Sequence, residues 1–336
     1  MPAAESLETN SQCKSFRDDP DIPKGSRIFI GPQGSGKTVA FVAAMDRLSR
    51  LAADGSIPRC EFRADYLRDQ NEQVETQSHL KHNADLLASG EWSTATDISQ
   101  HRVFKLTRKG SFWDTVDHLA ICDYPGKSFD AAFMDPAKLK QADSDGLLTR
   151  EAEKLLHDMS RASGIFLTID GAMLFNGLGD NPGYFTAHFS ECLTRMTQFL
   201  DGRHLQQSLD GWLVAQPSSF WLIEAAWRNV SHWFKGRRKI AVLFTKSDVL
   251  PESFRLLEQL KNLDPYFLNN LRDLDMDCRF FRVSAVPKTK IDEKTGCKVP
   301  DQWSSEKSTG ILDAMAWMLD LNLPGNLLKP ETSFKL

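Results

Sequence analysis

The stretch RIFIGPQGSGKTVAFVAAM, residues 27–45, decides the fold of this chain. Its first four residues are mostly apolar and predict a short buried strand. The next eight, GPQGSGKT at positions 31–38, fit the pattern G-x-x-x-x-G-K-[ST], and a helix is predicted over residues 37–53. In this pattern, the N–H groups of a glycine-rich turn and the N-terminus of the following helix surround the phosphates of a nucleotide. The segment therefore predicts a nucleoside triphosphate site.

Each residue type in this loop suits a phosphate ligand. Glycine allows the backbone angles and the close approach that the turn needs. Lys37 is expected to reach the β- and γ-phosphates and to act in catalysis, and the Thr38 hydroxyl is expected to bind Mg²⁺. Kinases, ATPases and GTPases share such a loop, so it leaves the reaction open. The residues of this segment expected to contact the nucleotide are Gly31, Gly34, Ser35, Gly36, Lys37, Thr38 and Val39.

Composition limits the class of protein. The chain has 336 residues, 41% hydrophobic and 26% charged, enough for one large α/β domain or two smaller ones. A net charge of -4 gives no general reason to expect nucleic-acid binding. The six cysteines show no C-x-x-C spacing, which favours a reducing, cytoplasmic location without a zinc site or a disulfide framework. Residues 1–21 lack the apolar core of a signal peptide, and no apolar run is long enough to span a bilayer, which leaves only peripheral membrane contact open.

Strands are expected to alternate with helices along the rest of the chain. Strands are predicted within 101–110, 116–126, 164–171, 239–248 and 279–285, and helices over 147–159, 184–200, 218–234 and 308–320. Residues 61–89 predict one or two exposed helices within an insertion. This alternation predicts an α/β fold of three layers, with a mostly parallel sheet flanked by helices. The expected organisation is a flexible arm at 1–24, one domain at 25–321 with insertions near 54–100 and 172–236, and a tail at 322–336.

Short polar motifs follow the predicted strands in a defined order. DYPG occupies positions 123–126, TKSD positions 245–248 and SA positions 284–285. Ligands of such sheets lie outside the carboxyl ends of the strands, where these motifs stand. Taken singly, DYPG is an ordinary turn and TKSD an ordinary helix start. Taken in order with the phosphate loop, the motifs resemble those of the translation-factor and Ras-like (TRAFAC) class of P-loop GTPases, over roughly residues 25–320.

The resemblance implies a guanine nucleotide with Mg²⁺. Guanine presents two donors on one edge, and a carboxylate at Asp248 accepts both, which adenine does not allow. Lys246 is expected to lie along the purine ring, and a backbone N–H near Ser284 or Ala285 to meet the guanine oxygen. Thr245 stands where Asn is commoner in the class. By the same resemblance, Asp123 would hold Mg²⁺ through water and the Gly126 N–H would sense the γ-phosphate.

A switch of this kind needs a hydroxyl that meets Mg²⁺ and the γ-phosphate only in the triphosphate state. The segment GEWSTATDIS at 90–99 lies just before a predicted strand. Thr96 is the expected ligand and Thr94 the alternative. The competing interpretation is an ordinary polar loop.

Two positions depart from efficient Ras-like enzymes. Lys127 follows DYPG where such enzymes carry the Gln that orients the attacking water. Hydrolysis is therefore expected to be slow, or to depend on another residue or on a partner. Gln33 lies inside the phosphate loop, where its amide would either assist at the γ-phosphate or obstruct it.

Loose flanking patterns resemble those of the bacterial double-GTPase group. They are the long insertion after the phosphate loop, the spacing of Gly90, Trp92 and Thr96, the DYPG motif and the closing stretch GILDAMAWML at 310–319. Members of that group act as switches in bacterial multi-gene systems, some linked to conflict or antiphage defence. A stretch with Trp212, Trp221, Trp227 and Trp233 predicts either a helix packed on the sheet or a partner-binding surface.

These observations favour a Mg²⁺-dependent GTP-binding switch with slow hydrolysis and a protein partner. Two other hypotheses stay open. An ATP-dependent motor or kinase would use the same phosphate loop. A scaffold that keeps its nucleotide without hydrolysis is motivated by Lys127.

Overall fold

The structure is a computed structural model, which describes residues 22–32, 34–65, 70–92, 100–110, 113–123, 126–133, 147–175, 182–201, 238–251, 255–263, 265–274, 276–328 and 333–335. The strands are β1 (Arg27–Ile30), β2 (Cys60–Ala64), β3 (Gln100–Arg108), β4 (Thr115–Asp123), β5 (Gly164–Asp170), β6 (Arg238–Thr245), β7 (Met276–Arg282), β8 (Thr289–Ile291), β9 (Lys298–Pro300) and β10 (Ser333–Lys335). The longer helices are α1 (Lys37–Ala53), α2 (Gln70–Ser89), α3 (Gly126–Phe133), α5 (Leu147–Arg161), α7 (Pro182–Asp201), α10 (Leu256–Leu263), α11 (Pro265–Asp273) and α12 (Ile311–Leu319). Short helical turns are α6 (Gly171–Phe175), η2 (Ser247–Val249) and η3 (Gly325–Leu327).

Eight strands form one mixed sheet in the order β10-β7-β6-β5-β1-β4-β3-β2. The five central strands, β7, β6, β5, β1 and β4, run parallel to one another. The outer strands are antiparallel: β3 to β4, β2 to β3, and β10 to β7. The prediction of a mostly parallel α/β sheet flanked by helices is confirmed. The strands β8 and β9 form a separate hairpin.

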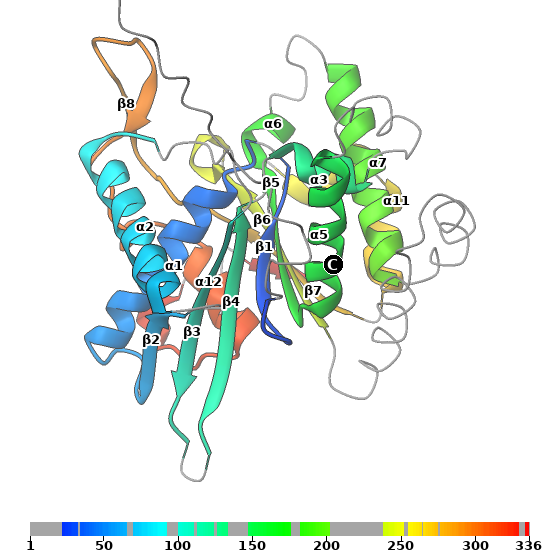
Figure 1. The fold of residues 1–336 in the computed structure, drawn as a ribbon. Helices are drawn as coiled ribbons and strands as arrows, with labels where there is room; N and C mark the ends of the chain where they lie inside the picture. The colour runs from blue at the N-terminus through cyan, green and yellow to red at the C-terminus, as the bar shows by residue number, and fades with distance from the viewer. Residues whose placement is uncertain are drawn as a thin grey trace, which may run out of the picture.

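Helices cover both faces of the sheet (Figure 1). Successive strand residues point to opposite faces, so Ile28 and Ile30 pack on one side and Phe29 on the other. The first side is covered by α3, α5, α7, α10 and α11, and the second by α1, α2 and α12. β1, β5 and β6 are buried on both faces for this reason, which explains why they were predictable as nearly continuous apolar runs.

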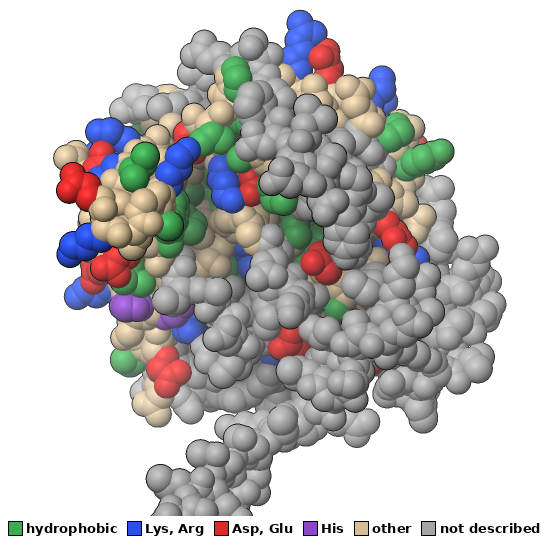
Figure 2. All heavy atoms as spheres, turned by 90° about the horizontal axis from the view of Figure 1, so that it is seen from above, with side chains coloured by type: hydrophobic (Ala, Val, Ile, Leu, Met, Phe, Trp, Pro, Cys, Tyr) green, Lys and Arg blue, Asp and Glu red, His purple; other side chains and the backbone are tan. Residues whose placement is uncertain are grey.

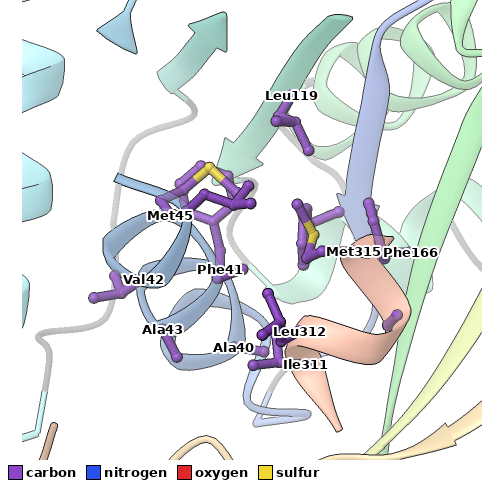
Figure 3. Packing of buried hydrophobic residues seen from close by; sticks show 14 of the residues in the cluster. Ala40, Phe41, Val42, Ala43, Met45, Leu119, Phe166, Ile311, Leu312 and Met315 are labelled. Carbon is purple, nitrogen blue, oxygen red and sulfur yellow. The ribbon is translucent and has the colours of Figure 1, made fainter. Parts of the chain in front are cut away.

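On the second face, α1 and α12 lie side by side against the sheet (Figure 3). Phe41 of α1 and Met315 of α12 point toward the layer that contains Phe166 of β5. Phe166 in turn stacks on Phe29 of β1, with ring centroids 4.3 Å apart. This packing fixes the start of α1, and with it the phosphate loop, relative to the central strands.

The insertion after α1 differs from its prediction. Residues 60–64 form β2, an edge strand, before the exposed helix α2, so the prediction of helix from residue 61 is wrong for this stretch. Its side chains alternate between half-exposed and exposed positions until the buried Ala64, which is the pattern of an edge strand. The sequence CEFRA is short and has two charged residues, Glu61 and Arg63, so it lacks the apolar run by which the central strands were identified.

Several other predicted elements are found with small shifts at their ends. The helix predicted over 184–200 is α7, and the helix predicted over 308–320 is α12. The residues between the strand predicted within 279–285 and the helix predicted over 308–320 contain the hairpin β8–β9, and the predicted tail contributes β10. The helix predicted over 218–234, with its tryptophans, lies outside the described residues. Within the described part of the chain, no helix combines the length and the apolarity that a bilayer crossing requires.

Candidate nucleotide site

The predicted motifs lie at the carboxyl edge of the parallel strands. β1 pairs with β4 on one side and with β5 on the other. After β1 the chain forms β2, β3 and β4 on one side of β1, and then β5, β6 and β7 on the other side. The direction in which strands are added therefore reverses between β1 and β5. Ligands of open α/β sheets bind outside the strand ends at such a point. The loop at 31–36, between β1 and α1, lies directly at this position.

The loop has a backbone conformation that only glycine adopts easily. Gly34 and Gly36 have φ angles of 75° and 76°. A Cβ atom on Gly31 would lie 2.2 Å from the Thr168 Oγ1 atom, so no side chain fits there. Gly36 is the N-cap of α1 and, as a glycine, has no side chain with which to cap it. A helix N-terminus beside a glycine-rich turn is suited to an anionic ligand.

A buried hydroxyl pair fixes the base of the loop. The Thr168 hydroxyl on β5 donates to the Ile30 carbonyl oxygen at 3.1 Å. The Ser35 Oγ atom lies 2.7 Å from the Thr168 Oγ1 atom, so the Ser35 hydroxyl donates to it. Both side chains are buried, Ser35 with 1% and Thr168 with 0% exposed. The Ser35 side chain therefore holds the loop on β5 and leaves phosphate binding to the backbone.

The turn after β6 is bonded to the same loop. The Thr245 hydroxyl donates to the Ser35 carbonyl oxygen at 2.6 Å, and the Lys246 Nζ atom to the Gly34 carbonyl oxygen at 3.1 Å. A Cβ atom on Gly36 would lie 3.3 Å from Thr245 Oγ1, so the contact leaves little space. The residues 245 and 246 were predicted from the TKSD motif, and both lie against the predicted phosphate loop, 210 and 212 positions away in sequence.

Asp170 is a residue of this site that the sequence analysis missed. It ends β5, and its Oδ2 atom lies 2.5 Å from the Lys246 Nζ atom. Its Oδ1 atom accepts the Met173 N–H at 3.1 Å, at the start of α6. The residue is 6% exposed. Its position directly after a buried apolar run was visible in the sequence, and the rule that selected DYPG and TKSD applies equally to it.

The second base motif lies beside the first. Asp248 is exposed in the turn η2, and its Oδ1 atom accepts a hydrogen bond of 2.8 Å from the Ser284 hydroxyl. Ser284 is 3% exposed and exchanges two backbone hydrogen bonds with Thr309, of 3.1 and 2.9 Å. The neighbouring Ala285 carbonyl oxygen accepts the Trp303 indole N–H at 2.8 Å. One oxygen of Asp248 is thus held in place while the carboxylate stays accessible.

The remaining predicted residues fall into two groups. Lys37, Thr38 and Val39 lie in the first turn of α1; Lys37 is 8% exposed. Asp123 is the last residue of β4 and Gly126 the first of α3, which puts both at the carboxyl edge. Gln33, Thr94 and Thr96 lie outside the described residues. The structure therefore brings together the phosphate loop and the motifs at 245–248 and 284–285.

The residues available for a metal suit Mg²⁺ bound largely through phosphate and water. Mg²⁺ takes oxygen ligands and usually keeps several waters, with one or two protein ligands beside the phosphates. Thr38 offers a hydroxyl at the start of α1. Among the residues that the structure describes, no three His, Cys, Asp or Glu side chains form a cluster able to hold a metal ion on their own. A Mg²⁺ ion at this place would be held by the Thr38 hydroxyl together with phosphate and water.

Seen from above, the carboxyl edge lies beside a strongly charged region (Figure 2). Lys, Arg, Asp and Glu side chains gather on the left of this view, over α2 and the hairpin β8–β9. Trp92, the third residue of the predicted switch segment at 90–99, donates its indole N–H to the Lys298 carbonyl oxygen of β9 at 2.7 Å. The start of the predicted switch segment is thus attached to a hairpin that follows the 284–285 motif.

No protein-family model matches this chain, and a search of curated proteins finds no match to it.

Proposed function

We propose that this protein is a Mg²⁺-dependent GTP-binding switch that hydrolyses GTP slowly to GDP and phosphate. One observation carries the proposal: the turn at 245–248 is bonded to the loop at 31–36 through Thr245 and Lys246. Asp248, whose carboxylate is accessible, follows these two residues in the same turn, so the turn links an accessible acceptor to a loop suited to phosphates. A nucleotide has a base at one end, which the Asp248 carboxylate would bind, and a phosphate chain at the other end, which the loop at 31–36 would bind.

The carboxylate favours guanine over adenine. A carboxylate only accepts hydrogen bonds, and guanine offers two adjacent donors, at N1 and at the 2-amino group. Adenine offers no such pair on one edge. Because Ser284 donates to one oxygen of Asp248, the carboxylate is oriented before the base arrives. An acceptor that is positioned in advance costs less to order on binding.

The proposed hydrolysis is slow because Lys127 stands in α3 directly after Gly126, where a water-orienting Gln is found in efficient enzymes of the class. The proposed switch uses Thr96 as the hydroxyl that meets Mg²⁺ and the γ-phosphate. A protein partner acting on the switch loops, or on the tryptophan-containing stretch near 212–233, would complete or read the active state.

The proposed architecture is a P-loop NTPase fold of the Ras-like class, in a cytoplasmic and bacterial setting. It is supported by the reversal of strand order at the phosphate loop and by the sequence order of the motifs. A scaffold that retains its nucleotide without turnover is the second candidate, and the lysine at position 127 favours it. An ATP-dependent enzyme would need a residue other than Asp248 to recognise the adenine base.

The first experiment is to identify the nucleotide carried by the purified protein, then to compete GTP against ATP with Mg²⁺ present. Guanine nucleotide and a preference for GTP are expected, with binding lost in Lys37→Ala. A preference for ATP, or no nucleotide binding, would overturn the proposal. Multiple turnovers of phosphate release, lost in Thr38→Ala, would exclude the scaffold.

A further inference from the structure

Asp170 contacts Lys246, which in turn contacts the loop at 31–36, so it belongs to the contacts that join the turn at 245–248 to this loop. Its Oδ2 atom lies 2.5 Å from the Lys246 Nζ atom, which also donates to the Gly34 carbonyl oxygen at 3.1 Å. Its Oδ1 atom accepts the Met173 N–H. The carboxylate therefore connects β5 and α6 to the turn after β6, and through Lys246 to the loop between β1 and α1.

Lys246 needs such an anchor for two reasons. Its backbone is in the left-handed region, with φ 54° and ψ 34°, which a residue with a side chain adopts at a cost. Its side chain is 48% exposed, so burial alone does not select one rotamer. The Asp170 carboxylate is 6% exposed and supplies a fixed, charged partner. Charge-assisted hydrogen bonds of this kind are stronger and more directional than neutral ones.

We infer that Asp170 is a positioning residue for nucleotide binding. Its carboxylate holds the Lys246 side chain beside the loop at 31–36. In this position the aliphatic part of Lys246 would face the base, while its ammonium group bonds to the loop. The inference rests on the proposed function. It adds a residue that none of the motifs contains. In this role Asp170 acts through its contact with Lys246.

The expected consequence is slow nucleotide release. When the carboxylate loses its charge, Lys246 keeps only the neutral bond to the Gly34 carbonyl oxygen and gains mobility. The loop at 31–36 and the turn that carries Asp248 then move apart more easily. Affinity differences of this kind are expressed mainly in the dissociation rate. The rate of GDP release should therefore change more than the rate of GDP binding.

The test is a double-mutant cycle on the full chain with Asp170→Asn and Lys246→Met, measuring release of a fluorescent GDP analogue by stopped flow. Asn is chosen because its Oδ1 atom still accepts the Met173 N–H. We expect Asp170→Asn to accelerate release about 10-fold in the wild-type background and less than about 2-fold when Lys246 is already Met. A purely structural role at α6 would give the same acceleration in both backgrounds.

A control removes a more exposed ion pair at the amino end of β6, the strand that Lys246 follows. Lys239 of β6 pairs with Asp320 at 2.5 Å, far from the phosphate loop along β6. Asp320→Asn is expected to leave GDP release within about 2-fold of wild type. An equal acceleration in this control would overturn the inference, because it would show a general loss of stability.

A conservative variant keeps the inference testable if Asp170→Asn does not fold. Lys246→Arg retains a cation facing Asp170 and should release GDP closer to wild type than Lys246→Met does. Equal release rates for Arg and Met would overturn the inference. If the wild-type protein binds neither guanine nor adenine nucleotide, the proposed function fails. If it binds GDP and Asp170→Asn releases it at the wild-type rate, only the role of Asp170 is overturned.

Discussion

The Ser284 hydroxyl donates a hydrogen bond of 2.8 Å to the Oδ1 atom of Asp248. The donor is almost fully buried and bonded through its backbone to Thr309, whereas the acceptor is exposed. The direction of the Asp248 carboxylate is therefore set by Ser284, which follows β7, and not by the turn η2 alone. This relationship joins two motifs that are separate in the sequence.

Ser284→Ala is expected to weaken the binding of guanine nucleotides, GDP included, about 2- to 10-fold. A hydrogen bond to a partly exposed charged group contributes roughly 0.5–1.5 kcal/mol, and each 1.4 kcal/mol is about a factor of ten in affinity. Isothermal titration of the variant with GDP and Mg²⁺ measures the change. Ser163→Ala serves as the control, because it removes a hydroxyl bond of 2.6 Å to the Gly25 carbonyl oxygen, next to the amino end of β5. Unchanged affinity in Ser284→Ala would contradict the proposed orientation of Asp248.

Asp248→Asn should change the preferred base. The amide replaces one acceptor with a donor, so it opposes the guanine 2-amino group and suits the second carbonyl of xanthine. We expect GTP affinity to fall about 100-fold or more, corresponding to roughly 3 kcal/mol, while xanthosine triphosphate binds better than to wild type. Competition between the two nucleotides gives the ratio directly. A variant that loses both nucleotides equally would indicate a structural role for the carboxylate.

The sequence predicted the strands that carry the site but not the connections between them. β1, β5 and β6 are buried on both faces, and burial on both faces requires a continuous apolar run, which is visible in one dimension. The contact between Lys246 and Asp170 joins residues 76 positions apart. Such a pair depends on which strands are neighbours, and the sheet order is not contained in local periodicity.

The missed edge strand has a different reason. β2 contacts only β3 within the described sheet, and its residues 61 and 63 are exposed. An edge strand of five residues buries little and carries charge that discourages further pairing, so its sequence resembles a polar loop or an exposed helix. Asp170 could have been selected, because it follows an apolar run as directly as Asp123 does.

Replacing Gly310 or Gly25 by alanine distinguishes the cost of a steric clash from the cost of backbone strain alone. Gly310 and Gly25 have φ angles of 74° and 83°, but a Cβ atom on Gly310 would lie 1.8 Å from the Arg282 carbonyl oxygen, whereas one on Gly25 meets nothing within 4 Å. Gly25→Ala should therefore cost about 1 kcal/mol of unfolding free energy, from the left-handed conformation alone. Gly310→Ala should cost roughly 3 kcal/mol or more. Urea unfolding compares them, and equal costs would contradict the close approach of α12 to β7.

His118 should make the protein less stable in mild acid. Burial lowers the pKa of His118 from its ordinary value of 6.5; Lys105 also lowers it, and Asp65, at 3.4 Å, and Asp117 oppose the shift. A lowered folded-state pKa means that stability is present above pH 6.5 and is lost as the pH falls through the folded pKa, because the unfolded chain takes up the proton first.

The measurement for His118 is the unfolding free energy at pH 7.5 and 5.5, for wild type and for His118→Gln. Wild type should lose more than the variant over this range, by up to about 1 kcal/mol, because Gln does not titrate. Other acidic and basic groups contribute equally to both proteins, so the difference isolates the histidine. A variant that loses as much stability as wild type would show that the pKa is not lowered.

Trp92 should report the nucleotide state by fluorescence. It is 44% exposed, its indole N–H is held by the Lys298 carbonyl oxygen at 2.7 Å, and it stands four positions before the predicted switch ligand Thr96. If Thr96 binds Mg²⁺ and the γ-phosphate, the chain next to Trp92 is drawn toward the nucleotide and the solvent around the indole changes. We expect an emission change when GDP is replaced by a non-hydrolysable GTP analogue, and loss of most of it in Trp92→Phe. Trp113, 83% exposed just before β4, provides the control, because Trp113→Phe should keep the response. A full response in Trp92→Phe would show that the switch segment lies elsewhere in the chain.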